Sequence, residues 1–166
     1  MFEGVSVDAF LHRPGSVPHL RALHRRYRLN YLAPNAGGGF LVAGGGAHLV
    51  RGQDGSERVE RVMDIVRVDS DFEVQWRWVL PAAVSHASIA SGPEGGAVAT
   101  ILTHEAAAVG QARFSDRGVG VVSLDDEGRL RWARILAMGY QRLPHHIALE
   151  PGPGGRVAIA MRDTIT

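Results

Sequence analysis

The chain carries one sequence pattern twice, and its first half a third time. The segment APNAGGGFLVAGG (33–45) is followed, after a polar stretch, by RVMDIVRVDSDFEVQWRWVL (61–80). The same order returns as ASGPEGGAVATIL (90–102) and GVGVVSLDDEGRLRWARIL (118–136), and ALEPGPGGRVAIAM (148–161) repeats the first half once more. Self-similarity of this kind predicts a fold built from stacked units, each of which buries its apolar face against its neighbour.

Each unit predicts four short strands rather than helices. The segments are short and rich in β-branched residues, and glycine-containing turns separate them. Gly95-Gly96 and Gly128 stand where turns need a positive φ, which costs glycine little. In the second unit the strands are expected at 86–91, 97–102, 119–124 and 129–136.

An aspartate and a tryptophan hold the same places in both complete units, as Asp69 and Trp76 and again as Asp125 and Trp132. The aspartate stands where a hairpin turn begins, so its carboxylate is expected to accept backbone N–H bonds. The tryptophan lies on the fourth strand, where a large apolar ring can fill the space between neighbouring sheets. Both residues are therefore predicted to be structural.

Composition supports a globular β domain and excludes several kinds of site. Hydrophobic residues make up 45% of the 166 residues, which argues against disorder, and the 21 glycines favour many tight turns. The chain has no cysteine, so it can form neither disulfides nor thiolate sites. No apolar run reaches the length of a membrane span, no signal peptide is apparent, and the compartment is not determined.

The first 29 residues fit the repeat least well. Between Asp8 and Asp54 six arginines occur without an acidic residue, a pattern more typical of a solvated face than of a nucleic-acid site. Residues 17–28 have helical spacing, whereas VSVDAF (5–10) and HLRALHRR (19–26) fit a third and fourth strand. The predicted divisions are 1–29 for an irregular basic segment, 30–84 and 85–140 for two complete units, and 141–166 for a partial unit.

The repeat resembles a family of bacterial β-propeller repeats. Residues 38–44, GGFLVAG, match its phrase DGGYIVAG, and Leu124-Asp125 with Gly128 and Trp132 matches LDSNGNVEWQKTYGG. The hairpin is also similar to the tryptophan-docking hairpin of quinoprotein propellers. It departs from that pattern by one residue fewer between Asp and Trp and by the lack of the threonine, so no cofactor is expected.

The resemblance implies an all-β fold of β-propeller-type repeats, with about three four-stranded antiparallel blades. Three blades are too few to close a ring. The expectation is therefore an incomplete ring that is completed by a homo-oligomer or that belongs to a longer chain, because exposed blade faces favour association.

Candidate ligand-binding residues are expected at one rim, near the starts of first strands and on the long connections 45–60 and 103–118. A cluster of histidines there could hold a metal or an anionic ligand, although pairing with backbone carbonyls or water is favoured, and no metal site is predicted. The candidates are His48, His86, His104, Arg113, His145 and His146.

No catalytic pattern is present. The chain lacks Gly-x-Ser-x-Gly, HExxH and a phosphate-binding loop. The favoured interpretation is a non-catalytic scaffold that binds a protein or glycan ligand through its loops. Two alternatives stay open: a fragment of a propeller enzyme that uses the rim histidines and acids, and a structural repeat of a larger surface protein.

Overall fold

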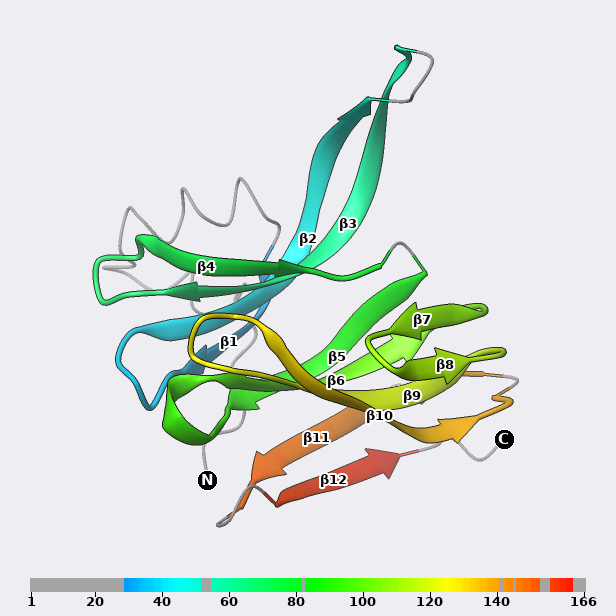
Figure 1. Ribbon diagram of the computed structural model, residues 1–166. Coiled ribbons are helices and arrows are strands. Elements are labelled where there is room, and N and C mark those ends of the chain that lie inside the picture. The colour runs from blue at the N-terminus through cyan, green and yellow to red at the C-terminus, as the bar shows by residue number, and fades with distance from the viewer. Residues whose placement is uncertain are drawn as a thin grey trace.

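The structure is a computed structural model that describes residues 29–51, 55–81, 83–140, 142–144, 146–152 and 156–162. Apart from one 3-10 turn, Pro93–Gly95 (η1), the regular structure in these ranges is β-strand (Figure 1). All pairings are antiparallel. The predicted all-β class is confirmed. The helix or strands expected within residues 1–28 lie outside the described residues.

Ten of the twelve described strands form two four-stranded sheets and one two-stranded sheet in the order of the repeat. The other two, β7 (Ala107–Val109) and β8 (Ala112–Phe114), pair as a separate hairpin. The first sheet has the order β1-β2-β3-β4, with β1 (Leu29–Pro34), β2 (Phe40–Arg51), β3 (Glu57–Val68) and β4 (Val74–Val79). The second has the order β5-β6-β9-β10, with β5 (Val84–Ser91), β6 (Ala97–Thr103), β9 (Gly118–Leu124) and β10 (Leu130–Met138). The third pairs β11 (His146–Pro151) with β12 (Val157–Arg162).

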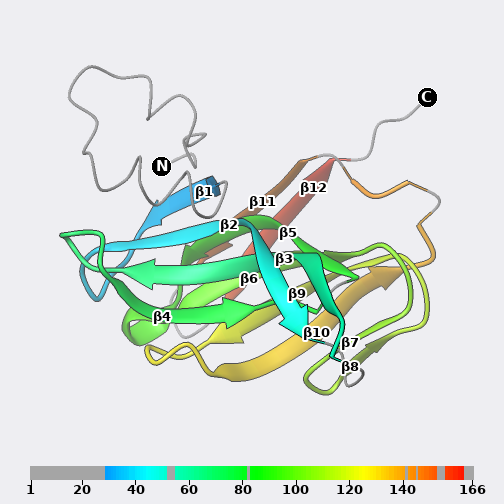
Figure 2. The same cartoon turned by 90° about the horizontal axis from the view of Figure 1, so that it is seen from above.

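The three sheets are stacked, with the second in the middle (Figures 1 and 2). β5 contacts β1 on one side and β11 on the other, so the first strands of successive sheets are neighbours. The main core lies between the first two sheets, where Leu41 and Ile65 face Ala99, Ile101 and residues beside them. Side chains on the other side of the second sheet, such as Val98, Thr100 and Val119, are also buried.

The β3–β4 and β9–β10 turns repeat the same hydrogen bonds. Asp69 Oδ1 accepts the N–H groups of Asp71 and Glu73 at 2.9 Å each. Asp125 Oδ1 accepts those of Glu127 at 3.0 Å and Arg129 at 2.8 Å. Each carboxylate satisfies two backbone donors of its turn, so the aspartate fixes where the chain reverses.

A glycine packs against each of these turns where no side chain can fit. A Cβ added to Gly39 would lie 2.1 Å from the carbonyl oxygen of Val68, and one added to Gly96 would lie 2.2 Å from that of Leu124. Such distances are far inside van der Waals contact, so the backbone approach itself requires glycine. This explains why the second glycine of the pair returns in both complete units.

The two turns differ at the position with the left-handed backbone, and this difference determines how the sheets meet. In the second sheet Gly128, at φ 79°, lies against the Trp76 ring of the first sheet, and an added Cβ would be 2.7 Å from Trp76 Cδ2. In the first sheet the same position is Phe72, at φ 63°, and its ring stacks on Phe40 with centroids 5.3 Å apart. The second sheet therefore receives a tryptophan, whereas the first sheet fills this space with its own aromatic pair.

The contact between Trp76 and Gly128 gives a stability prediction. Gly128→Ala adds a Cβ at a left-handed φ and pushes it into the indole, so we expect a loss of about 2–4 kcal/mol in the free energy of unfolding, measured by urea denaturation. The matched control is Gly38→Ala, at φ 86° with nothing within 4 Å of the added atom. It should cost about 1–2 kcal/mol. Equal losses in the two variants would contradict the contact.

The turn aspartate gives a prediction for pH. The side-chain hydrogen bond from Arg129 at 2.9 Å, aided by backbone N–H bonds from Arg129 and Glu127, holds the pKa of Asp125 below its usual range. A lowered carboxyl pKa adds stability above the unfolded-state pKa of about 3.9, and this stability is lost as the pH falls through the folded-state pKa.

We therefore expect Asp125→Asn to lower the melting temperature at pH 7. The difference from wild type should shrink as the pH falls below about 4 and vanish once the pH passes below the folded-state pKa. Asp126→Asn is the control, since the Asp126 carboxylate accepts no hydrogen bond from the described residues. Thermal unfolding followed by circular dichroism across pH 2–8 gives the comparison. A melting-temperature difference for Asp125→Asn that does not change with pH would rule out this role of Arg129.

Candidate functional site

The connections between the second and third strands leave the same end of their sheets. In Figure 1 the first of them rises toward the top of the picture and the second lies on the right. The first connection continues β2 and β3 as a two-stranded arm, residues 46–51 paired with 57–62, beyond the reach of β1 and β4. The second carries a short hairpin, β7 (Ala107–Val109) with β8 (Ala112–Phe114). The rim predicted from the two long connections is thus built from strands more than from loops.

The β7–β8 hairpin is anchored in the core. Val109, Ala112 and Phe114 are all buried, and Phe114 packs so closely on β9 that a Cβ at Gly120 would be 2.7 Å from its ring. Residues 103–118 are therefore not a free loop. Their polar positions are held in place by an apolar base, which favours a preformed surface.

His104 and Arg113, two of the predicted binding residues, lie on this connection and are exposed. The Nε2 of His104 lies 3.0 Å from Ser85 Oγ, and the carbonyl of His104 accepts a 3.3 Å bond from Arg117 Nε. Arg113 Nη1 donates to the carbonyl of Gly110 at 2.6 Å, within its own hairpin. These contacts orient both side chains but join them to no shared ligand site.

For three of the other predicted histidines the structure describes the backbone but not the side chain, and it does not describe the fourth. His48 lies in the arm part of β2, His86 in β5 opposite Ile101, and His146 at the start of β11 opposite Arg162. Their side chains, and all of His145, lie outside the described residues. Among the residues that the structure does describe, no three His, Asp or Glu side chains are arranged to hold a metal ion.

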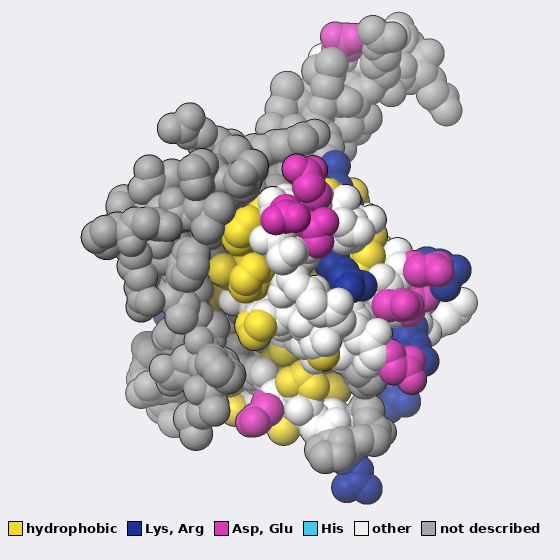
Figure 3. All heavy atoms as spheres, turned by 90° about the vertical axis from the view of Figure 1, so that its left-hand side faces the viewer, with side chains coloured by type: hydrophobic (Ala, Val, Ile, Leu, Met, Phe, Trp, Pro, Cys, Tyr) yellow, Lys and Arg dark blue, Asp and Glu magenta, His cyan; other side chains and the backbone are white. Residues whose placement is uncertain are grey.

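The opposite rim, formed by the β1–β2, β3–β4 and β9–β10 turns, mixes acids with arginines (Figure 3). Three of its carboxylates bind neighbouring side chains. Asp125 binds Arg129, Glu127 Oε2 lies 2.6 Å from Arg129 Nη2, and Asp69 Oδ2 accepts Gln75 Nε2 at 2.7 Å. These contacts belong to the turns and indicate a structural role for this rim.

One ion pair is buried within the first sheet. Asp64 is 1% exposed, and its Oδ2 accepts Arg77 Nε at 2.9 Å and Nη2 at 2.6 Å. A carboxylate taken out of water needs such a partner, so the pair fixes β3 against β4.

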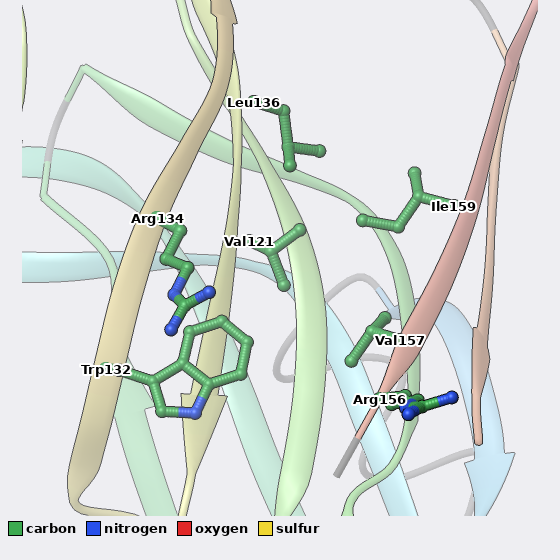
Figure 4. A pocket seen from close by; sticks show the side chains of 7 residues that line it. All are labelled: Val121, Trp132, Arg134, Leu136, Arg156, Val157 and Ile159. Carbon is green, nitrogen blue, oxygen red and sulfur yellow. The ribbon is translucent and has the colours of Figure 1, made fainter. Parts of the chain in front are cut away.

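A groove lies between the second and third sheets (Figure 4). It has a volume of about 530 Å³ and is lined on the second-sheet side by Val121, Trp132, Arg134 and Leu136, and on the third-sheet side by Arg156, Val157 and Ile159. The guanidinium of Arg134 lies 5.5 Å from the centre of the Trp132 ring, a cation–π distance. We call this surface the Trp132 groove.

The Trp132 groove is the counterpart of the interface between the first and second sheets, but its side chains are more exposed. Trp76 and Leu80 in the first sheet correspond to Trp132 and Leu136 in the second. Leu80 is 1% exposed beneath the second sheet, whereas Leu136 is 42% exposed. The difference arises because the second sheet has four strands to cover its neighbour, and the third has two among the described residues.

Comparison of the chain with protein-family models, with curated proteins and with solved structures gave no match. Within the described ranges, no helix has the length and apolar character needed to cross a membrane.

The repeat predicts a purely structural role for Trp132 and does not predict the groove. One signal was available: Trp78 in the first unit is replaced by Arg134 in the second. An arginine in place of a tryptophan within an otherwise apolar row indicates that this row reaches solvent.

The different burial of Leu80 and Leu136 predicts that truncation to alanine lowers the free energy of unfolding by different amounts at these equivalent positions. Leu80→Ala should lower the free energy of unfolding by about 2–4 kcal/mol, because it leaves a cavity in the core. Leu136→Ala should cost less than about 1 kcal/mol, because its side chain already contacts water. Urea denaturation of both variants gives the comparison, and a cost for Leu136→Ala as large as that for Leu80→Ala would show that the groove is closed in solution.

Proposed function

We propose that the chain is a non-catalytic binding scaffold made of β-propeller-type repeats, and that it holds a protein or glycan ligand at the rim of the arm and the β7–β8 hairpin. The observation that carries the proposal is that both second-to-third-strand connections extend from the same end of the stacked sheets. Binding surfaces are commonly carried by connections that a rigid sheet scaffold positions.

The propeller-type assignment is supported by the order of the strands. Both larger sheets are antiparallel meanders in chain order, apart from the β7–β8 insertion, and their first strands lie next to each other. A tryptophan of one sheet packs on a turn glycine of the next. Stacking of this kind leaves the strand ends, rather than the sheet faces, available to a ligand.

The rim offers polar groups suited to sugars or to a protein surface. His104 and Arg113 are exposed and held by neighbouring carbonyl or hydroxyl groups, so they lose little conformational freedom when a ligand binds. The buried Phe114 keeps their hairpin in position. Preformed donors of this type fit hydroxyl and carboxylate acceptors.

The test screens the purified chain against a glycan array and against peptide arrays, and measures the affinity of each hit by calorimetry. Arg113→Ala should weaken binding at least tenfold, which corresponds to about 1.4 kcal/mol and is typical of a lost charged hydrogen bond. Arg131→Ala, which changes another exposed arginine, on β10 and away from this rim, should leave affinity unchanged.

Two outcomes would contradict the proposal. One is equal affinity of the Arg113→Ala and Arg131→Ala variants for every hit. The other is stoichiometric metal in the purified protein that His86→Ala and His145→Ala remove, because this result would favour the enzyme alternative.

A further inference from the structure

We propose that the Trp132 groove and the open edge of β12 together form a docking site for a β-hairpin of another polypeptide. The hairpin would carry glycine in its turn, opposite Trp132, and carboxylates close to Arg134 and Arg156. This surface lies between the second and third sheets and is separate from the rim of the proposed function.

The first step is that the third sheet corresponds to the inner half of the other two. Gly152 N donates to the carbonyl of Arg156 at 2.7 Å, as Gly92 N donates to that of Gly96 at 2.8 Å. β11 and β12 thus match β5 and β6. β6 pairs onward with β9, whereas β12 pairs with no described strand except β11. An edge of this kind can add a strand through main-chain hydrogen bonds.

The second step is that the chain itself shows what covers such a tryptophan. Trp76 is covered by the β9–β10 hairpin, with Gly128 directly against the ring. Trp132 has the equivalent place in the second sheet, yet its groove is open and Leu136 beside it is 42% exposed. A hairpin beyond β12 would cover both side chains in the way that β9–β10 covers Trp76 and Leu80.

The third step is the charge of the groove. Arg134 and Arg156 are both exposed at its walls, and neither forms an ion pair with a described residue. The first interface has Trp78 where the groove has Arg134. Since complementary charge steers association and fixes register, the arriving hairpin is an acidic one.

Among the described residues, a second copy of this chain offers no unoccupied hairpin with the same glycine turn. The inner edges of β3 and β9 already pair with β2 and β6, and the Gly128 turn already lies against Trp76 of its own chain. Neither hairpin can therefore take the place beyond β12 that a third and a fourth strand would have. The β3–β4 turn also carries Phe72 in place of glycine. Because no described hairpin of this chain fits the site, we assign it to a hairpin of another polypeptide.

The experiment uses the full chain and a cyclised peptide that copies residues 118–138, with Trp132→Phe in the peptide so that only the protein fluoresces. Its turn carries Gly128 and three acids, Asp125, Asp126 and Glu127. We expect saturable binding by calorimetry and a blue shift of the protein's emission. A peptide with Gly128→Phe, which copies Phe72, should bind at least about tenfold more weakly.

Two protein variants locate the binding. Trp132→Ala should weaken binding at least about tenfold, as expected for a central aromatic anchor. Leu136→Lys changes a half-exposed residue, so the protein keeps its fold while the groove is blocked. Val74→Lys, at an equally exposed position on β4, is the control and should bind like wild type.

Three results would overturn the proposal. The first is the absence of binding to wild type up to about 1 mM peptide. The second is equal affinity of the peptides with and without Gly128→Phe, or of wild type and Leu136→Lys. The third is a wild-type dimer in sedimentation that Leu136→Lys converts to a monomer, which would assign the groove to a second copy.

Discussion

The packing of the Trp76 indole on the turn at Gly128 determines how the first two sheets stack. The ring can approach the turn backbone because no Cβ is present, and the turn can adopt its positive φ for the same reason. Side chains on either side, including Leu41, Leu80 and Ile101, then close around the ring into one core. The main-chain hydrogen bonds of each sheet fix its own strands, whereas this aromatic contact holds one sheet to the next.

Asp69 and Asp125 give the two turns the same backbone conformation, although different side chains pack on them. Each carboxylate holds two N–H groups of the turn, so the residue three positions later has a left-handed backbone in both sheets. In the second sheet that residue is a glycine and the tryptophan fits. In the first it is Phe72, whose stacking on Phe40 offsets a backbone conformation that non-glycine residues rarely adopt. The turn of the second sheet thus binds a tryptophan of the first sheet, whereas the turn of the first sheet is filled by the aromatic pair of Phe72 and Phe40.

Much of the fold could be predicted, because the relevant signals are local. The strand expected at 119–124 is Gly118–Leu124, and the one expected at 97–102 is Ala97–Thr103, since glycine turns and β-branched residues mark their limits. The β7–β8 hairpin could not be predicted, because three-residue strands carry no periodicity. The arm within 45–60 was also missed, because residues that are polar enough for a loop can extend a ribbon. The Trp132 groove depends on how many strands cover it, a property of the assembled sheets that no single unit encodes.

The order of the units along the chain has a consequence for how the protein is made. Trp76 leaves the ribosome before Gly128 does, so this indole is synthesised ahead of the turn that covers it. Since the strands of each larger sheet follow one another in the chain, a sheet can form from neighbouring segments and then receive the next sheet on a surface that is already complete. Synthesis and stacking therefore proceed in the same direction, and the apolar surface left exposed at any moment is that of the most recently completed sheet.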